Sequence, residues 1–383
     1  AEGRARRVAA LRRRRRAGGR AAVATVAPGA QAGHARPLMA AERQLTTREL
    51  NRALLARQGL LERRAVPLPA VLDAMGTLQA QYAPSMYVGL WSRMREFDRD
   101  QLTAALEERA AVQGTLLRGT IHLVSRADYW PFALVARPVL REWFTRTSKG
   151  EPPLDEIEEL RARLRSRLDE GQLQQSQIDE LIGRPARRWM NSFLDLLRVP
   201  PSGTWERRRA DLYADAETEL GPPKSTPEEA QELLIRRYLG AFGPAAPADI
   251  ASWAGLAVRT VTAALDRIDH VAHEAEDGAT LIDLPEMSLP DPDRPVPIVF
   301  LPTWDATLLV HARRTQILPE RHRPKIFGTK TPFSFPTFLV DGTVAGTWRY
   351  EHGRIELAEF EPLPPRVRKQ VEQAAQPLAA LHE

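Results

Sequence analysis

The sequence of 383 residues contains no cysteine. Disulfide bonds and zinc sites with thiolate ligands are therefore excluded, and the composition fits a reducing compartment, so a cytoplasmic location is expected. The sequence also lacks an apolar run of about 18 residues, which is the length that a membrane-spanning helix requires. These absences leave a protein of two or three domains that is large enough to bury a substantial core.

Several common motifs for catalysis and ligand binding are missing as well. The sequence has no Gly-x-x-x-x-Gly-Lys phosphate loop, no Gly-x-Gly-x-x-Gly dinucleotide turn and no Gly-x-Ser-x-Gly nucleophile elbow. Its eight histidines do not form a His-Glu-x-x-His zinc motif. We therefore expect neither a metal ion nor a cofactor.

The positive charge of the chain lies at its N-terminal end. The formal net charge is +5, but residues 1–38 contain ten arginines and a single acidic residue, whereas the rest carries 44 basic and 48 acidic side chains. The body is therefore mildly acidic, and DNA binding by it requires a local basic surface. The low complexity of residues 1–38 predicts a disordered basic tail. A DNA-binding arm, a signal peptide and an extension upstream of a start at Met39 are the alternatives for this segment.

The clearest structural unit is predicted over residues 223–285. An amphipathic helix over residues 226–243 has Thr226 as its N-cap and Pro227 at its first position. Two further helices follow, and the turn Glu276-Asp277-Gly278 predicts a β-hairpin. The order helix, short helix, helix, hairpin is that of a winged helix, whose third helix can enter a DNA groove.

The same order recurs more weakly in two earlier segments, residues 45–150 and 151–222. In the first, helices are expected over residues 46–60, 68–79 and 98–111, before two short strands that turn at Arg118-Gly119. In the second, three helical segments precede a wing over residues 203–214. The predicted fold class is therefore α+β, with three tandem winged-helix units.

The C-terminal segment, residues 296–383, is expected to be rich in β-structure. A proline-rich linker over residues 285–300 precedes it, and Trp304-Asp305 is interpreted as a buried tryptophan followed by a capping aspartate. The turns Asp341-Gly342 and His352-Gly353 each separate alternating strands, which predicts two hairpins. A final helix over residues 365–383 would close this small sheet or partial barrel.

Two glutamines, Gln79 and Gln81, flank Ala80 near the predicted end of the second helix. On a helix, positions i and i+2 point about 200° apart, so the two amides can share a target only if the helix ends between or just after them. Pro84 marks a helix boundary nearby, because proline disfavours helical geometry at the preceding residue. By spacing alone, two solvated amides at a helix end are the commoner explanation.

Two short basic segments are candidates for phosphate contacts. Arg118, Thr120 and His122 lie at the tip of the hairpin predicted in the first unit, and Arg313 and Arg314 follow an apolar strand. Composition alone favours solvated surface clusters in both places.

Considered together, these segments resemble a known family. "LNRALLARQGL", "LQAQYAPSMYVGLWSR" and "LLRGTIHLVSRADYW", with "LPTWDATLLVHARRTQIL" and "FPTFLVDGTVAGTWR" later, are similar to the AlkZ-type winged-helix DNA glycosylases. The resemblance runs from about Leu45 to the C-terminus and excludes the tail. The family signature, two glutamines around an apolar or small residue, falls on Gln79-Ala80-Gln81. A sister branch has aspartate in the second position, so Gln81 resembles the branch that unhooks interstrand crosslinks such as those left by azinomycin-type natural products.

The resemblance implies tandem winged helices closed into a C shape, and a monofunctional glycosylase that cleaves the N-glycosidic bond of N7-alkylated purines. It implies that Gln79 and Gln81 are catalytic and that the partner is double-stranded DNA carrying N7-alkylpurine or crosslink lesions. Such an enzyme would give resistance to alkylating agents. We expect a monomer, since a clamp of this shape needs no second copy. A winged-helix transcriptional regulator and a non-catalytic DNA-damage-binding protein are the alternatives.

Overall fold

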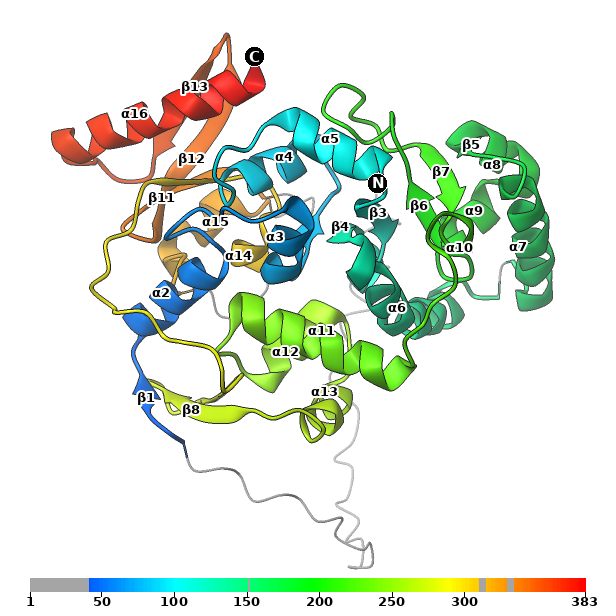
Figure 1. The fold of residues 1–383 in the computed structure, drawn as a ribbon, viewed down its shortest axis with the longest axis horizontal. Helices are drawn as coiled ribbons and strands as arrows, with labels where there is room; N and C mark the ends of the chain where they lie inside the picture. Colours follow the sequence, from blue (N-terminus) through cyan, green and yellow to red (C-terminus); the bar gives the residue numbers. More distant parts are fainter. Residues whose placement is uncertain (1–40, 151, 310–314, 329–333) are drawn as a thin grey trace, which may run out of the picture. The chain divides into compact units, whose positions relative to one another are not determined.

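Helices and small β-sheets alternate along the chain in the computed structural model, which describes residues 41–150, 152–309, 315–328 and 334–383 (Figure 1). The predicted mixture of helices and strands in one α+β fold is therefore confirmed. The basic tail of residues 1–38 lies outside the described residues.

Residues 44–147 place helices around a β-hairpin. The strands are β1 (Gln44–Leu45), β2 (Leu78–Gln79), β3 (Ala111–Thr115) and β4 (Ile121–Ser125), and the 3-10 turn η1 (Leu117–Gly119) joins β3 to β4. The helices are α2 (Thr47–Arg57), α3 (Leu68–Met75), α4 (Ala83–Trp91), α5 (Arg99–Glu107) and α6 (Arg126–Thr147). The predicted turn at Arg118-Gly119 is confirmed, with φ of 54° and 71° at the two residues.

The second predicted helix ends earlier than the sequence indicated. Helix α3 stops at Met75, and Gly76 follows with a φ of 76° that favours glycine. A Cβ at Gly76 would lie 3.2 Å from the Cβ of Ala241 on α11 (Pro227–Phe242), so the close approach of α11 also requires glycine. The chain then extends into β2, and the prediction of one helix over residues 68–79 is wrong. Pro84 does mark a boundary, but it lies in the first turn of α4.

A single sheet connects the first two predicted units. Its strands run in the order β2-β4-β3-β6-β7-β5, with β3 antiparallel to β6. The added strands are β5 (Leu173–Gln174), β6 (Leu196–Arg198) and β7 (Leu212–Asp215), and the helices beside them are α7 (Leu154–Leu168), α8 (Gln175–Ile182), α9 (Arg184–Met190) and α10 (Ala216–Leu220). The strands of these two segments therefore form a continuous surface, which local sequence patterns did not indicate.

The helix order predicted for residues 226–283 is present. Helix α11 is followed by α12 (Pro247–Ala254), α13 (Val258–Leu265), β8 (Val271–Ala275) and β9 (Thr280–Asp283). Thr226 caps α11 as predicted, because its Oγ1 accepts a 3.2 Å hydrogen bond from the Glu229 amide. Strand β1 adds to β8 in parallel, a long-range pairing that the sequence did not indicate.

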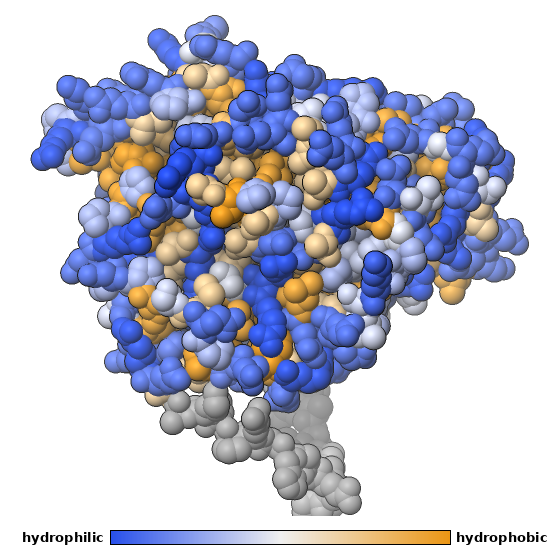
Figure 2. Space-filling view, viewed as in Figure 1, coloured by the Kyte–Doolittle hydropathy of each residue, from blue (hydrophilic) through white to orange (hydrophobic). Residues whose placement is uncertain are grey.

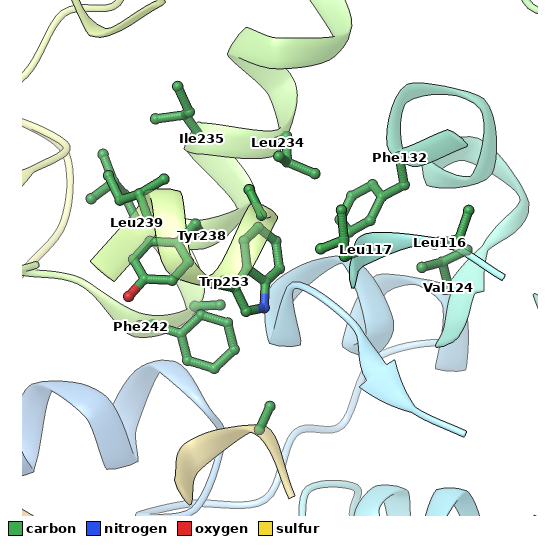
Figure 3. Packing of buried hydrophobic residues seen from close by; sticks show 14 of the residues in the cluster. Leu116, Leu117, Val124, Phe132, Leu234, Ile235, Tyr238, Leu239, Phe242 and Trp253 are labelled. Carbon is green, nitrogen blue, oxygen red and sulfur yellow. The ribbon is translucent and has the colours of Figure 1, made fainter. Parts of the chain in front are cut away.

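Trp253 lies at the centre of the core beside this segment (Figure 3). Its ring packs edge-on against Phe132 of α6, with centroids 5.9 Å apart, and is tilted against Tyr238 of α11 at 5.2 Å. Leu116 and Leu117, which lead into the η1 turn, belong to the same buried cluster. The position of the β3–β4 hairpin is therefore fixed by the core itself.

The C-terminal segment forms a four-stranded antiparallel sheet covered by a helix. Its strands are β10 (Val299–Leu301), β11 (Thr337–Val340), β12 (Thr343–Glu351) and β13 (Arg354–Glu359), and α16 (Pro365–His382) packs against β13. Short α14 (Ala306–Leu309), η2 (Glu320–His322) and α15 (Arg323–Ile326) lie between β10 and β11. Both predicted hairpin turns are confirmed, with positive φ at Asp341, Gly342, His352 and Gly353.

The molecular face in Figure 2 is largely hydrophilic, with hydrophobic residues in small separate groups. Of the large apolar side chains in the described part of the chain, a few are well exposed, among them Tyr82 next to the glutamine pair. No helix within the described ranges combines the length and apolar character that crossing a bilayer requires.

Candidate active site

Gln79 and Gln81 lie where strand β2 is followed by helix α4. Gln79 ends β2, and Gln81 and Tyr82 form a bend before α4. Gln79 Nε2 donates a 2.7 Å hydrogen bond to Gln81 Oε1. The expected helix end is therefore replaced by the end of a strand and a bend, and the two carboxamides meet there.

Pairing with β4 holds this strand in place. Gln79 lies opposite His122 in the antiparallel register, and the Ala80 amide donates a 2.8 Å hydrogen bond to the Ile121 carbonyl oxygen. The Thr77 hydroxyl donates to the Leu123 carbonyl oxygen at 3.0 Å. The backbone is thus anchored before Gln79 and between the two glutamines.

The glutamine pair opens into a cavity of about 390 Å³. Its lining comes from the β2 strand, the β3–β4 turn and two segments of the C-terminal part, and consists of Gln79, Gln81, Arg118, Thr120, Trp304, Leu309, Phe327, Gly328 and Ser334. Among these described residues there is no carboxylate and no histidine. A proton acceptor that titrates near neutral pH is therefore absent from the lining, and neutral amides and hydroxyls supply its polar groups.

The pair retains hydrogen-bonding capacity toward this cavity. The bond between the two residues uses the Nε2 of Gln79 and the Oε1 of Gln81. Within the described part of the chain, no protein group bonds to Gln79 Oε1 or Gln81 Nε2, which leaves one acceptor and one donor beside each other. Gln79 is half-buried and Gln81 exposed, so neither amide is confined to apolar packing.

Arg118 and Thr120 line the same cavity, as their place on the predicted hairpin suggested. Arg118 is exposed and donates a hydrogen bond from Nη1 to the Trp253 carbonyl oxygen at the end of α12. Its chain passes close to Gly255, where a Cβ would lie 3.3 Å from Arg118 Cγ. The guanidinium is thus held at the rim by contacts with α12.

His122 lies beneath the cavity, with only 1 % of its surface exposed. Its Nδ1 lies 2.9 Å from the Thr120 carbonyl oxygen, which can only accept, so Nδ1 carries the proton. Burial, together with the positive charge of Arg118, lowers the pKa of His122 to about 3. The ring is therefore neutral and covered, and this placement supports a role under Gln79 and Thr120 rather than a direct phosphate contact.

Arg313 and Arg314 lie outside the described residues. The segment before them is held by a buried ion pair, in which Asp305 accepts hydrogen bonds of 2.9 and 3.0 Å from the Arg93 guanidinium. Both side chains are fully buried. Asp305 also caps α14 by accepting from the Thr307 amide at 3.0 Å, as the sequence suggested.

Trp304 differs from its prediction as a buried side chain. It is half-buried, has a φ of 56° and lines the cavity opposite the glutamines. Its amide donates a 2.6 Å hydrogen bond to the Ser334 hydroxyl, so these two cavity residues hold each other. The Trp-Asp dipeptide was the only sequence signal for this wall, because the positive φ that orients it leaves no trace in composition.

The described residues contain no cluster of three or more acidic or histidine side chains that could hold a metal ion. Burial raises the pKa of the Asp128 carboxyl to about 6 despite hydrogen bonds from Arg237. Asp128 is on α6 and is not among the residues of the glutamine cavity. The polar chemistry of the cavity therefore rests on its amides and hydroxyls.

Comparison with known proteins shows the family of the chain. A family model described as DNA glycosylase AlkZ-like matches residues 72–381, a range that contains both glutamines and the whole cavity lining. The chain belongs to this family. The protein is accordingly a DNA glycosylase, a hydrolase of DNA repair that acts on the bond between a base and its sugar.

A solved structure shows the same fold. The glycosylase is similar to Streptomyces sahachiroi DNA glycosylase AlkZ, with a TM-score of 0.74 and 18 % sequence identity over 88 % of this chain and 97 % of that one. No curated protein sequence matches the chain. The arrangement of the elements is thus retained although most side chains differ.

Proposed function

We propose that this glycosylase hydrolyses the N-glycosidic bond of N7-alkylated purines and unhooks DNA interstrand crosslinks of the azinomycin type, with Gln79 and Gln81 as the catalytic residues. The observation that carries the proposal is the 2.7 Å amide pair at the edge of a cavity whose described lining has no carboxylate. Such a site suits a substrate whose leaving group is already activated.

The chemistry follows from the charge on the base. Alkylation at N7 makes the purine cationic, so when the bond from C1′ to N9 breaks, its electron pair neutralises the base and no strong general acid is needed. The sugar becomes oxocarbenium-like, a water forms the new bond to C1′, and its proton passes to bulk solvent. Gln79 Oε1 accepts from this water and Gln81 Nε2 donates to it, which orients the attack.

The same reasoning explains selectivity for damage. A glutamine amide does not ionise near neutral pH and cannot remove a proton as a carboxylate does. Orientation by one preorganised group contributes about 3–4 kcal/mol to the transition state. This contribution suffices for a cationic leaving group and is too small for an unmodified nucleotide, so normal DNA is spared.

A crosslinked base cannot swing freely into a deep pocket, because it is tied to the opposite strand. Gln81 is exposed, and Arg118 and Thr120 stand at the rim of the same cavity. We infer that these two residues contact the DNA backbone while the glutamines reach C1′ without full extrusion of the base. Arg313 and Arg314 are proposed as further phosphate contacts.

We also propose that residues 45–150, 151–222 and 223–285 are winged-helix units and that residues 296–383 form the β-rich closure. The helix-helix-helix-hairpin order of α11 to β9 supports this for the third unit. The enzyme would act as a cytoplasmic monomer, associated with the nucleoid when bound to DNA. Family membership and the amide-lined cavity favour an enzyme over a winged-helix regulator or a damage-binding protein.

The decisive test uses Gln79→Ala and Gln81→Ala on a duplex with one N7-methylguanine, read as strand breaks after heating in alkali. Each variant should lose about 10²–10³ in single-turnover rate with little change in DNA affinity. Gln101→Ala, an exposed glutamine on α5, is the matched control. Excision at the wild-type rate by both variants would contradict the catalytic assignment, and intact crosslinked duplex on a denaturing gel would contradict unhooking.

A further inference from the structure

A second cavity, of about 260 Å³, lies beside the glutamine cavity. The residues that matter for its chemistry are Tyr82, Ser85, Arg208, Trp348, Tyr350 and His382. They come from the start of α4, the loop before β7, strand β12 and the end of α16. Side chains far apart in the sequence therefore converge on one small hollow.

Neighbouring residues of two chain segments line the two cavities. Gln81 lines the first cavity and Tyr82 the second, and in the same way Trp304 lines the first and Thr303 the second. A group bound in the second cavity therefore contacts residues that are next in sequence to those of the glutamine cavity.

Aromatic rings dominate this second cavity. Tyr350 stacks on His382 with centroids 4.4 Å apart and planes 11° from parallel, and Trp348 meets His382 edge-on at 6.0 Å. Burial, followed by the charges of Arg208 and Arg99, lowers the pKa of His382 to about 4, so its ring is neutral near pH 7. Arg208 donates a 3.3 Å hydrogen bond to the Tyr82 hydroxyl at the same hollow. Flat apolar faces beside a cation suit a planar aromatic ligand.

Two polar atoms in the cavity wall lack partners. Ser85 is 4 % exposed, and neither its Oγ nor the Nε2 of His382 has a hydrogen-bond partner among the described residues. Buried polar groups are normally satisfied, so these two atoms are available to a ligand that has hydrogen-bonding atoms of its own.

We propose that this second cavity binds a planar aromatic group of the DNA substrate next to the scissile sugar, through stacking on Tyr350 and a hydrogen bond with Ser85. The inference deepens the proposed function, because it makes the cavity a specificity site of the same enzyme. The ring is either the aromatic part of a bulky N7 adduct or the nucleobase beside the lesion. Both have a π-face and polar ring atoms.

The test compares excision of N7-methylguanine and N7-(pyridylmethyl)guanine in the same duplex. Tyr350→Leu removes the stacking face, Tyr350→Phe retains it as the matched control, and Ser85→Ala removes the unpaired hydroxyl. If the adduct occupies the cavity, Tyr350→Leu should lower the excision rate about tenfold for the pyridylmethyl adduct and less than twofold for the methyl adduct. Ser85→Ala should shift the ratio in the same direction without lowering Tm, since it breaks no hydrogen bond within the described protein.

A third substrate carries N7-methylguanine between two abasic analogues. If the cavity holds a neighbouring nucleobase, Tyr350→Leu should lower the excision rate equally for both adducts. This decrease should disappear when the neighbours are abasic. An equal loss that persists with abasic neighbours, or wild-type ratios in both variants, overturns the proposal. Failure of the proposed function is a separate result, because then the wild-type enzyme releases neither adduct.

Discussion

Gln79 Nε2 lies 2.7 Å from Gln81 Oε1, with Gln79 at the end of strand β2 and Gln81 in the bend that follows. The bond fixes the rotation of both amides, because each carboxamide is planar and one end of each is engaged. The remaining Oε1 and Nε2 then form a preorganised acceptor and donor.

Excision of N7-methylguanine should be independent of pH between about 6 and 8.5, since the described cavity lining contains no group that titrates there. The single-turnover rate across this range is the measurement. A bell-shaped profile with a limb inside the range would point to a titrating acid or base that the amide mechanism does not contain.

Gln81→Asp should give the enzyme a titratable base in the same position. An exposed aspartate has a pKa of about 4, so the variant is expected to keep excision at neutral pH and to lose it progressively below about pH 5. The wild-type enzyme, assayed beside it in the same buffers, should show no such acid limb. Identical pH profiles for the two proteins would show that residue 81 does not act on the attacking water.

Asp305→Asn should destabilise the protein by about 3–5 kcal/mol, because the charge of Arg93 would remain buried without its partner. Urea unfolding measures this change. Glu356→Gln, which breaks the exposed ion pair with Arg349, is the control and should leave the midpoint almost unchanged. Comparable losses of stability in both variants would mean that burial does not determine how much the Arg93–Asp305 pair contributes to the free energy of unfolding.

His122 should make stability fall in mild acid. Its pKa is about 3 in the folded protein and about 6.5 when unfolded, so the unfolded chain takes up a proton first as pH drops. The stabilisation that depends on neutral His122 is fully present well above pH 6.5. At pH 5 the free energy of unfolding is lower by about 2 kcal/mol. His122→Asn keeps a donor to Thr120 and cannot titrate, so the wild type should lose about this much more than the variant between pH 7.5 and 5.

Arg118→Gln should weaken DNA binding and reduce the slope of log affinity against log salt by about 1, as expected for the loss of one phosphate contact. Fluorescence anisotropy at several salt concentrations gives the slope. Arg366→Gln on α16 serves as an exposed arginine control. An unchanged slope in Arg118→Gln would show that the Arg118 side chain makes no phosphate contact.

Local chemistry explains which elements could be predicted from the sequence. Thr226 caps α11 through a bond to Glu229, and the Asp341-Gly342 and His352-Gly353 turns need positive φ at both positions. These preferences act within four residues, so a short stretch of sequence contains all the information. The glutamine signature was visible for the same reason.

The geometry of the site was decided at longer range. Gly76 and Thr77 are poor helix formers, so the end of α3 at Met75 has a local cause, but the pairing of the following residues with β4 as a strand was decided by long-range contacts. Trp304 faces the cavity because Ser334 and the buried Arg93–Asp305 pair hold its loop.

The amino-acid sequence specifies the residue types, namely two neutral amides, an arginine-bearing turn and no cysteine. The meeting of the two amides depends on the fold, because side chains two positions apart diverge on a helix, whereas here the chain leaves α3 and Gln79 ends a strand. The pairing of β2 with β4 makes that choice.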